Sequence, residues 1–168
     1  IACLITEPYL GGGGSYHPQK EYLQLLERFC RDNDIVFILD EIFVGFRLAM
    51  GGAQEYFDVR ADMVTYGKTL GGGLPVGVVC GSRALMQRYR EDRPADICFA
   101  RGTFNAHPYV VAAMAAFLKR LDRPEVRSLY DGLEQRWNDR CAQFNSRLQA
   151  AGVPVQVGNM SSIWTVLY

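Results

Sequence analysis

The sequence predicts an α/β protein built on a mostly parallel sheet. Of its 168 residues, 49% are hydrophobic, a fraction that can bury a core. Four short apolar runs without polar alternation are typical of strands covered on both faces: residues 1–6, 35–39, 63–66 and 76–80. Segments with the apolar spacing of helices lie between and after these runs. We therefore expect a sheet with helices on both faces.

The helices are predicted from apolar spacing and from residues that start helices. Residues 20–34 follow Pro18 and carry apolar side chains at i, i+3, i+4 and i+7. These side chains are Tyr22, Leu25, Leu26 and Phe29. Further helices are expected at 82–90, with Ser82 as N-cap, and at 108–121, where a proline fits the first turn. The first helix and its flanking runs form a strand-helix-strand unit.

The segment after Pro124 is predicted to be one long helix that ends at Gly152. Its apolar residues share one helical face: Val126, Leu129, Tyr130, Leu133, Trp137, Cys141, Phe144 and Leu148. Residues 153–157 and 162–168 are predicted strands around Gly158-Asn159. Because a two-stranded ribbon is barely stable alone, and no initiator methionine is present, we expect this chain to be part of a longer protein.

Three functional side chains occupy the ends of predicted strands: Glu7, Asp40 and Lys68. In open α/β sheets, ligands bind outside the carboxyl ends of the strands. Lys68 precedes three glycines at 71–73, which let a ligand approach the backbone, and a lysine there can form a Schiff base with an aldehyde cofactor. Asp40 could hold the pyridinium nitrogen of that cofactor, which would be pyridoxal phosphate (PLP).

Each of these residues also has an ordinary interpretation. Lys68 could be a lysine in a glycine-rich turn, and Asp40, followed by Glu41, could cap a helix. The segment before Lys68 resembles a P-loop, but Asp62 occupies the place of its first glycine. The combination of strand-end residues favours the cofactor site.

Composition excludes several other functions. The net charge is zero and no run of like charges occurs, so we expect neither nucleic acid nor a membrane surface as a partner. No apolar stretch is long enough to span a bilayer. His17 and His107 lack ligand spacing, so we expect no metal. Five widely spaced cysteines predict reduced thiols and a cytoplasmic protein.

Several motifs together resemble the class III PLP-dependent aminotransferases. They are Asp40-Glu41-Ile42-Phe43-Val44-Gly45-Phe46-Arg47, Gly51-Gly52-Ala53-Gln54-Glu55-Tyr56, Gly67-Lys68-Thr69-Leu70-Gly71-Gly72-Gly73-Leu74-Pro75-Val76-Gly77 and Gly102-Thr103-Phe104-Asn105-Ala106-His107-Pro108. The resemblance covers nearly the whole chain and is close to the glutamate-1-semialdehyde aminomutase branch. It implies the central part of a fold type I, aspartate aminotransferase-like, large domain, with residues 76–80 as an antiparallel strand.

The resemblance also implies roles for individual residues. Lys68 would form the Schiff base with PLP, Asp40 would pair with the pyridine nitrogen, and Ile42 would pack on one ring face. Thr103 would bind the cofactor phosphate of the neighbouring subunit, which implies a homodimer with shared active sites; alternatively, it is a turn or N-cap residue. Glu7 belongs to a Glu-Pro turn and would be structural or catalytic.

Three further positions bear on the site. Arg47 could be a site residue, but a salt bridge that orders its turn is the favoured interpretation. Phe43 stands where many family members carry a glutamine that touches the cofactor, and Gly12 stands where some carry an acidic gate. These departures leave the amine specificity open.

The resemblance implies a domain division and a location for the rest of the site. Residues 1–122 would belong to the PLP-binding large domain, and residues 123–168 would be a connecting helix and the start of a small α+β domain. The phosphate-binding loop and the aromatic residue on the second ring face would precede residue 1, so we expect the chain to be inactive alone.

The expected reaction is transamination from a small-molecule amino donor to a keto or aldehyde acceptor. Alternatives are a 2,1-aminomutase, which Gly-Gly-Ala-Gln at 51–54 favours, and an aminotransferase module of a polyketide or nonribosomal peptide synthetase. A non-catalytic interaction domain that kept only the fold is the alternative from a different class.

Overall fold

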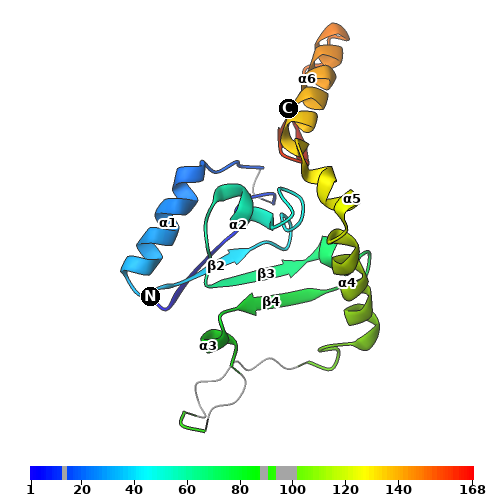
Figure 1. Cartoon of the computed structure of the whole chain (residues 1–168). Coiled ribbons are helices and arrows are strands. Elements are labelled where there is room, and N and C mark those ends of the chain that lie inside the picture. The colour runs from blue at the N-terminus through cyan, green and yellow to red at the C-terminus, as the bar shows by residue number, and fades with distance from the viewer. Residues whose placement is uncertain (13–14, 88–90, 94–101) are drawn as a thin grey trace.

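The structure is a computed structural model that describes residues 1–12, 15–87, 91–93 and 102–168 (Figure 1). The strands are β1 (Cys3–Thr6), β2 (Val36–Asp40), β3 (Met63–Gly67), β4 (Gly77–Gly81), β5 (Gln156–Met160) and β6 (Ile163–Leu167). The α-helices are α1 (Lys20–Asp32), α2 (Gly52–Phe57), α3 (Arg83–Met86), α4 (Pro108–Leu121), α5 (Pro124–Arg127) and α6 (Leu133–Ala150). Two 3₁₀ turns, η1 (Lys68–Gly71) and η2 (Ser128–Tyr130), complete the described elements.

The first four strands form one sheet in the order β1-β2-β3-β4. β1, β2 and β3 are parallel, and β4 runs antiparallel to β3, as predicted for a mostly parallel sheet. The carboxyl ends of the parallel strands therefore share one edge. Helix α4 stands at this edge in Figure 1 and contacts η1.

One face of the sheet carries the core. Leu23 and Cys30 of α1 lie in one buried cluster with Phe37 and Leu39 of β2, and α2 adds Ala53 and Phe57 to the same cluster. On the opposite face, Ile5 and Val79 are 60% and 51% exposed. The predicted helical cover is thus confirmed for one face within the described residues.

The buried side of α1 differs from the predicted stripe. Tyr22, Leu25 and Phe29 are at least half exposed, whereas Leu23 and Cys30 are fully buried. Leu23, Leu26 and Cys30 also have helical spacing, and this second stripe faces the sheet because it packs against β2 and α2.

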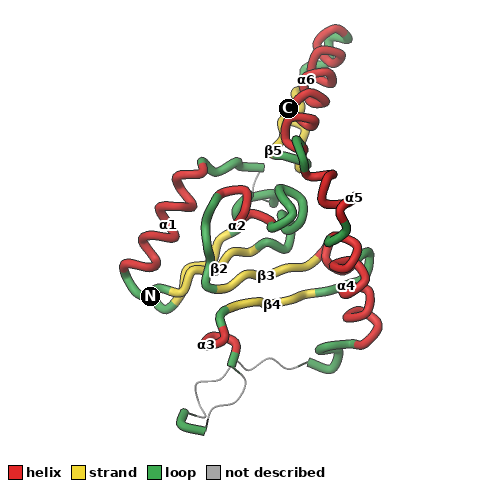
Figure 2. The backbone as a smooth tube through the Cα atoms, in the orientation of Figure 1, coloured by secondary structure: helices red, strands yellow, loops and turns green. Residues whose placement is uncertain are grey.

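The prediction of a single helix after Pro124 is wrong. The segment divides into α5, η2 and α6, and Gly132 interrupts it with a φ of +64°. A glycine in the left-handed region ends the helical path even though the apolar spacing continues through it. Figure 2 shows α5 and α6 extending away from the sheet.

No described helix is long and apolar enough to cross a membrane.

The turn of the last hairpin also differs from the prediction. Gly158 and Asn159 lie inside β5, opposite Thr165 and Trp164, and the turn is made by Ser161 and Ser162. Met160 and Ile163, on either side of this turn, join the buried cluster of the sheet. The hairpin therefore packs against the N-terminal part of the chain. The predicted domain boundary at residue 122 falls between α4 and α5, and the division into domains stays a prediction.

Of the two other predicted helices, one is confirmed in full and one in part. The helix at 108–121 is confirmed as α4. Ser82 caps α3 as predicted, since its Oγ accepts a hydrogen bond from the Leu85 amide at 3.4 Å, but α3 ends at Met86 and residues 88–90 lie outside the described part. Helix α2 and η1 were not predicted.

Candidate functional site

The three predicted strand-end residues lie at the same edge of the sheet. Thr6 pairs with Leu39, so Glu7 and Asp40 are the next residues along two adjacent strands. Asp40 pairs with Thr65 of β3, and Lys68 lies three residues beyond Thr65. Glu7 is exposed, and its carboxylate has no hydrogen bond to another described residue. Asp40 and Lys68 have neighbours that define their positions more closely.

Described residues donate hydrogen bonds to one carboxylate oxygen of Asp40 and leave the other without a donor. Its Oδ1 accepts hydrogen bonds from the Ile42 amide at 3.0 Å and from the Thr65 hydroxyl at 2.9 Å. No described residue donates to Oδ2. The chain enters a loop after Asp40 and α2 begins only at Gly52, so the helix-cap interpretation is wrong. The carboxylate is held by one oxygen and offers the second to a ligand.

Lys68 occupies a strained position directly after β3. It has a φ of +41°, in the left-handed region that costs a non-glycine residue about 1–3 kcal/mol and that clusters at functional sites. A Cβ added to Gly67 would lie 3.2 Å from Cγ2 of Ile42 and 3.1 Å from the Val76 carbonyl. Gly67 thus lets Ile42 pack directly against the strand end that carries Lys68.

Phe43 faces the lysine. Its ring centroid is 5.2 Å from Nζ of Lys68 and 5.2 Å from Cζ of Arg47, and the ring stacks on Tyr9 at 5.8 Å. Arg47 makes no ion pair within the part of the chain that the structure describes, so the predicted salt bridge is corrected to a cation-π contact. The aromatic ring that replaces the family's glutamine is therefore a direct neighbour of Lys68.

Residues 41–51, which we call the site loop, are anchored by Glu41. Glu41 is fully buried, its Oε2 accepts a hydrogen bond from the Ala53 amide at 2.7 Å, and its carbonyl accepts one from Gly45 at 2.8 Å. Burial raises the pKa of Glu41, while hydrogen bonds from the backbone amides of Ala53 and Gln54 oppose the rise. Gly52 has a φ of +73°, and a Cβ there would lie 2.1 Å from Oε2. The carboxyl group joins the site loop to the start of α2.

Thr103 stands apart from these residues. It is exposed and lies in the turn that precedes α4, where the Asn105 amide donates to the Gly102 carbonyl at 3.0 Å. Among the described residues, no hydrogen bond connects Thr103 with Lys68 or Asp40. Its role toward a neighbouring subunit stays a prediction.

Thr65 was not predicted as a site residue. A hydroxyl within an apolar strand has no chemical signature, and only the pairing of Asp40 with Thr65 brings the two side chains to the same face. The available signal was the position of Thr65, three residues before Lys68 in a strand expected beside Asp40.

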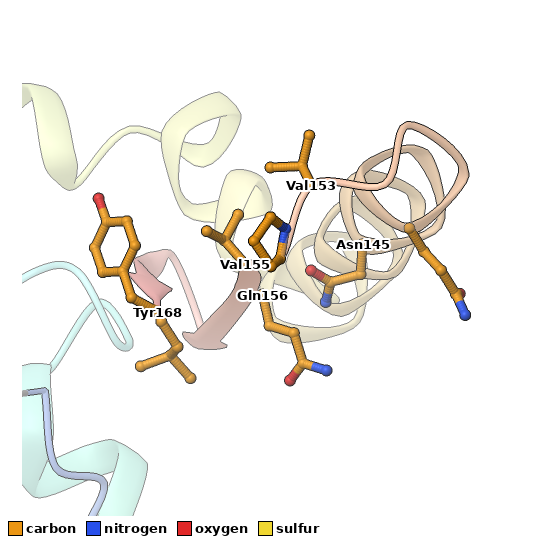
Figure 3. Close-up of a pocket in the computed structure, with 8 residues that line it drawn as sticks. Asn145, Val153, Val155, Gln156 and Tyr168 are labelled. Atoms are coloured by element: carbon orange, nitrogen blue, oxygen red, sulfur yellow. The ribbon is translucent and has the colours of Figure 1, made fainter.

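A separate hollow lies at the other end of the chain (Figure 3). It has a volume of about 530 Å³ and lies between α6 and the last hairpin, with Asn145, Val155 and Gln156 among its lining residues. Its lining holds no carboxylate, lysine or histidine. It is therefore unsuited to the chemistry of the strand-end residues.

The structure thus places Asp40 and Lys68 at the ends of the neighbouring strands β2 and β3 of a mostly parallel sheet. A sequence profile of the aminotransferase class-III family matches residues 1–165, and the chain belongs to this family. The cofactor of the family is PLP.

Two of the most similar curated relatives carry the same name. The chain is 47% identical over 122 residues to a glutamate-1-semialdehyde 2,1-aminomutase of Methanocaldococcus jannaschii, covering 73% of this chain and 28% of that protein. It is 38% identical over 168 residues to the Methanothermobacter thermautotrophicus protein of the same name, covering 100% of this chain and 38% of that protein. The chain thus spans well under half the length of these relatives.

Solved structures show the same fold. An omega-transaminase from Sphaerobacter thermophilus matches with a TM-score of 0.82 and 30% identity, over 98% of this chain and 36% of that one. A transaminase with PLP bound matches with a TM-score of 0.80 and 26% identity, over 98% of this chain and 38% of that one.

Proposed function

We propose that the protein catalyses PLP-dependent transfer of an amino group from a small-molecule donor to a keto or aldehyde acceptor. The observation that carries the proposal is the free Oδ2 of Asp40 at the sheet edge where Lys68 follows β3. Ile42 packs on Gly67, the residue before Lys68. An anionic acceptor, an apolar side chain and an amine suit the protonated nitrogen, ring face and aldehyde of PLP.

When bound, PLP supplies an aldehyde that condenses with amines and a ring that takes up the electron pair released from the substrate carbon. Lys68 contributes its Nζ, first as the amine that holds the cofactor. The same Nζ would then carry the proton that leaves the substrate carbon, and so act as the general base of the transfer. The left-handed backbone of Lys68 and the contact of its Nζ with the ring of Phe43 restrict the position of the amine.

Asp40 keeps the ring nitrogen protonated through its free Oδ2. The two donors on Oδ1, the Ile42 amide and the Thr65 hydroxyl, fix the orientation of the carboxylate plane. Ile42 excludes water from one ring face. The chain's own contribution is thus the position of one amine and one carboxylate.

The remaining assignments concern Thr103, which would act in a second subunit, and Glu7. We propose that Thr103 binds the cofactor phosphate in the neighbouring subunit of a homodimer, because it is exposed and stands apart from the site of its own chain. Glu7 is assigned a supporting role at the edge of the sheet. A dimer whose subunits share active sites follows from the Thr103 assignment.

We also propose a cytoplasmic location. The four described cysteines, Cys3, Cys30, Cys80 and Cys141, are free thiols, and Cys98 lies outside the described residues. Free thiols persist in reducing compartments.

Cofactor binding is tested by the visible absorbance of the full-length protein with PLP. The wild type should show the band of lysine-bound cofactor, and Lys68→Ala should lose it. Lys119→Ala is the matched control, because Lys119 lies in the last turn of α4 and should leave the band unchanged. Absence of the band in the wild type, or its persistence in Lys68→Ala, would overturn the proposal.

A second candidate function is a 2,1-aminomutase, which moves the amino group within one molecule. The relatives that are 47% and 38% identical carry this name, and the Gly-Gly-Ala-Gln stretch at 51–54 favours it. The two functions are separated by adding a keto acid to the enzyme and its amino donor. Formation of a new amino acid from the keto acid supports transamination, whereas isomerisation of the donor without it supports the aminomutase.

A further inference from the structure

The turn of the last hairpin binds the site loop through hydroxyl groups. Ser162 Oγ donates to the carbonyl of Arg47 at 2.7 Å, and Ser161 Oγ donates to the carbonyl of Leu48 at 2.9 Å. The hydroxyl of Tyr130 donates to the carbonyl of Phe46 at 2.9 Å. Three consecutive carbonyls of the site loop are therefore held by side chains that lie more than 80 residues away in sequence.

The serine turn is built in a way that retains these hydroxyls. Ser161 is fully buried and has a φ of +48°, a conformation for which glycine or asparagine is the usual choice in a tight hairpin turn. Its neighbours Met160 and Ile163 anchor the turn in the buried cluster that also contains Leu48. A strained, buried serine is explained by the hydrogen bond that its side chain makes.

The loop bound by this turn carries the side chains that face the cofactor lysine. Phe43 and Arg47 belong to the site loop. The ring centroid of Phe43 lies 5.2 Å from Nζ of Lys68 and 5.2 Å from Cζ of Arg47. The other end of the loop is fixed by Glu41, through its bonds to Gly45 and Ala53. Movement of the carbonyls at 46–48 would therefore be transmitted to Phe43 and to the wall beside Lys68.

We propose that Ser161, Ser162 and Tyr130 are positioning residues that hold the site loop against Lys68, so that the hairpin sets the geometry of the cofactor site. This inference rests on the proposed function, because it assigns the loop to the cofactor-binding lysine. The hydroxyls act on backbone carbonyls and touch neither cofactor nor substrate.

Two readouts on the full-length protein test the proposal. The first is hydrogen exchange of the site-loop amides without cofactor, which reports the clamp itself. The second is the equilibrium affinity for PLP, which reports its effect on the site. The test variant is Ser161→Ala with Ser162→Ala, and Tyr130→Phe is a second variant that removes one hydroxyl without changing ring volume. Ser146→Ala is the control, because it removes a hydroxyl that donates to the Ala142 carbonyl at 3.0 Å on the surface of α6.

The serine variant should exchange the site-loop amides at least about tenfold faster and bind PLP about tenfold more weakly, which corresponds to the loss of one to two net hydrogen bonds. Because the lost hydrogen bonds also lower the free energy of unfolding, the midpoint of thermal unfolding should fall by several degrees, but exchange in α1 should accelerate by a smaller factor than exchange in the site loop. Ser146→Ala should change neither readout. Tyr130→Phe should shift both readouts in the same direction by a smaller factor. If the serine variant does not fold, Tyr130→Phe alone decides.

Unchanged exchange in the site loop would overturn the clamp. Exchange that accelerates by the same factor in α1 as in the site loop would reduce the hydroxyls to general structural residues and also overturn it. Faster loop exchange with unchanged PLP affinity would overturn the positioning role while the proposed function stands. Failure of the wild type to bind PLP at Lys68 would instead sink the proposed function and the positioning role together.

Discussion

Gly52→Ala tests whether a buried carboxyl group shapes the site loop. Gly52 has a φ of +73°, and a Cβ there would lie 2.1 Å from Oε2 of Glu41 and 3.0 Å from its Cδ. The new methyl group must displace the carboxyl group from the Ala53 amide, which it now meets at 2.7 Å. Gly152→Ala is the matched control, because its φ is +66° and nothing lies within 4 Å of the new Cβ.

The magnitude follows from two contributions. Placing a Cβ in the left-handed region costs about 1–2 kcal/mol in either variant. Leaving the buried carboxyl group of Glu41 or the Ala53 amide without its partner costs about 1–3 kcal/mol more, and this second contribution applies to Gly52→Ala alone. We expect a loss of about 2–5 kcal/mol for Gly52→Ala and about 1–2 kcal/mol for Gly152→Ala.

Urea unfolding followed by tryptophan fluorescence measures both variants against the wild type. The two losses should differ by about 1–3 kcal/mol at equal urea dependence. Equal losses in the two variants would refute the reasoning, because they would leave only backbone strain and no contribution from Glu41.

Two further predictions concern the hydrogen bond from Thr65 to Asp40 and the pKa of Glu41. Thr65→Val removes the hydroxyl that donates to Asp40 at 2.9 Å and should weaken PLP binding about 10-fold or more, as for a hydrogen bond to a charged group, whereas Thr65→Ser should bind nearly as the wild type; equal affinities by equilibrium dialysis would contradict this. The pKa of Glu41 is raised by burial above 4.5, so its contribution to stability is fully present below pH 4.5 and is lost as pH rises through the raised pKa. The unfolding free energy of the wild type minus that of Glu41→Gln should therefore fall with rising pH, and an increase would contradict the assignment.

The positions of the four strands of the main sheet and of the strand-end residues could be predicted from the sequence. Apolar runs end at Asp40 and shortly before Lys68, and parallel pairing brings those ends together whatever the details of packing. This geometric rule explains why Asp40 and Lys68 were found without knowledge of their neighbours.

Features that depend on tertiary contacts could not be predicted in the same way. The apolar spacing after Pro124 continues through Gly132, where φ is positive and after which the separate helix α6 begins. The hairpin turn falls at Ser161 rather than at Gly158 because Met160 and Ile163 are drawn into the core of the sheet. Periodicity reports local preference, whereas these two outcomes were decided by packing between distant segments.

The same limit applied to the site. Thr65 is a neutral hydroxyl in a strand, and its contact with Asp40 exists only in the observed register. Phe43 was treated as the loss of a hydrogen bond, and its ring contact with Lys68 became visible only in three dimensions. Residues with distinctive chemistry were predicted, and residues that act through their contacts were not.

The central claim is that Lys68 is the amine that holds the cofactor. Borohydride reduction of the PLP-loaded full-length protein, followed by peptide mass spectrometry, fixes the cofactor on the lysine that carries it. The chain offers three candidates, Lys20, Lys68 and Lys119. The account predicts the added mass on Lys68, and a label on another lysine, or no label at all, would contradict it.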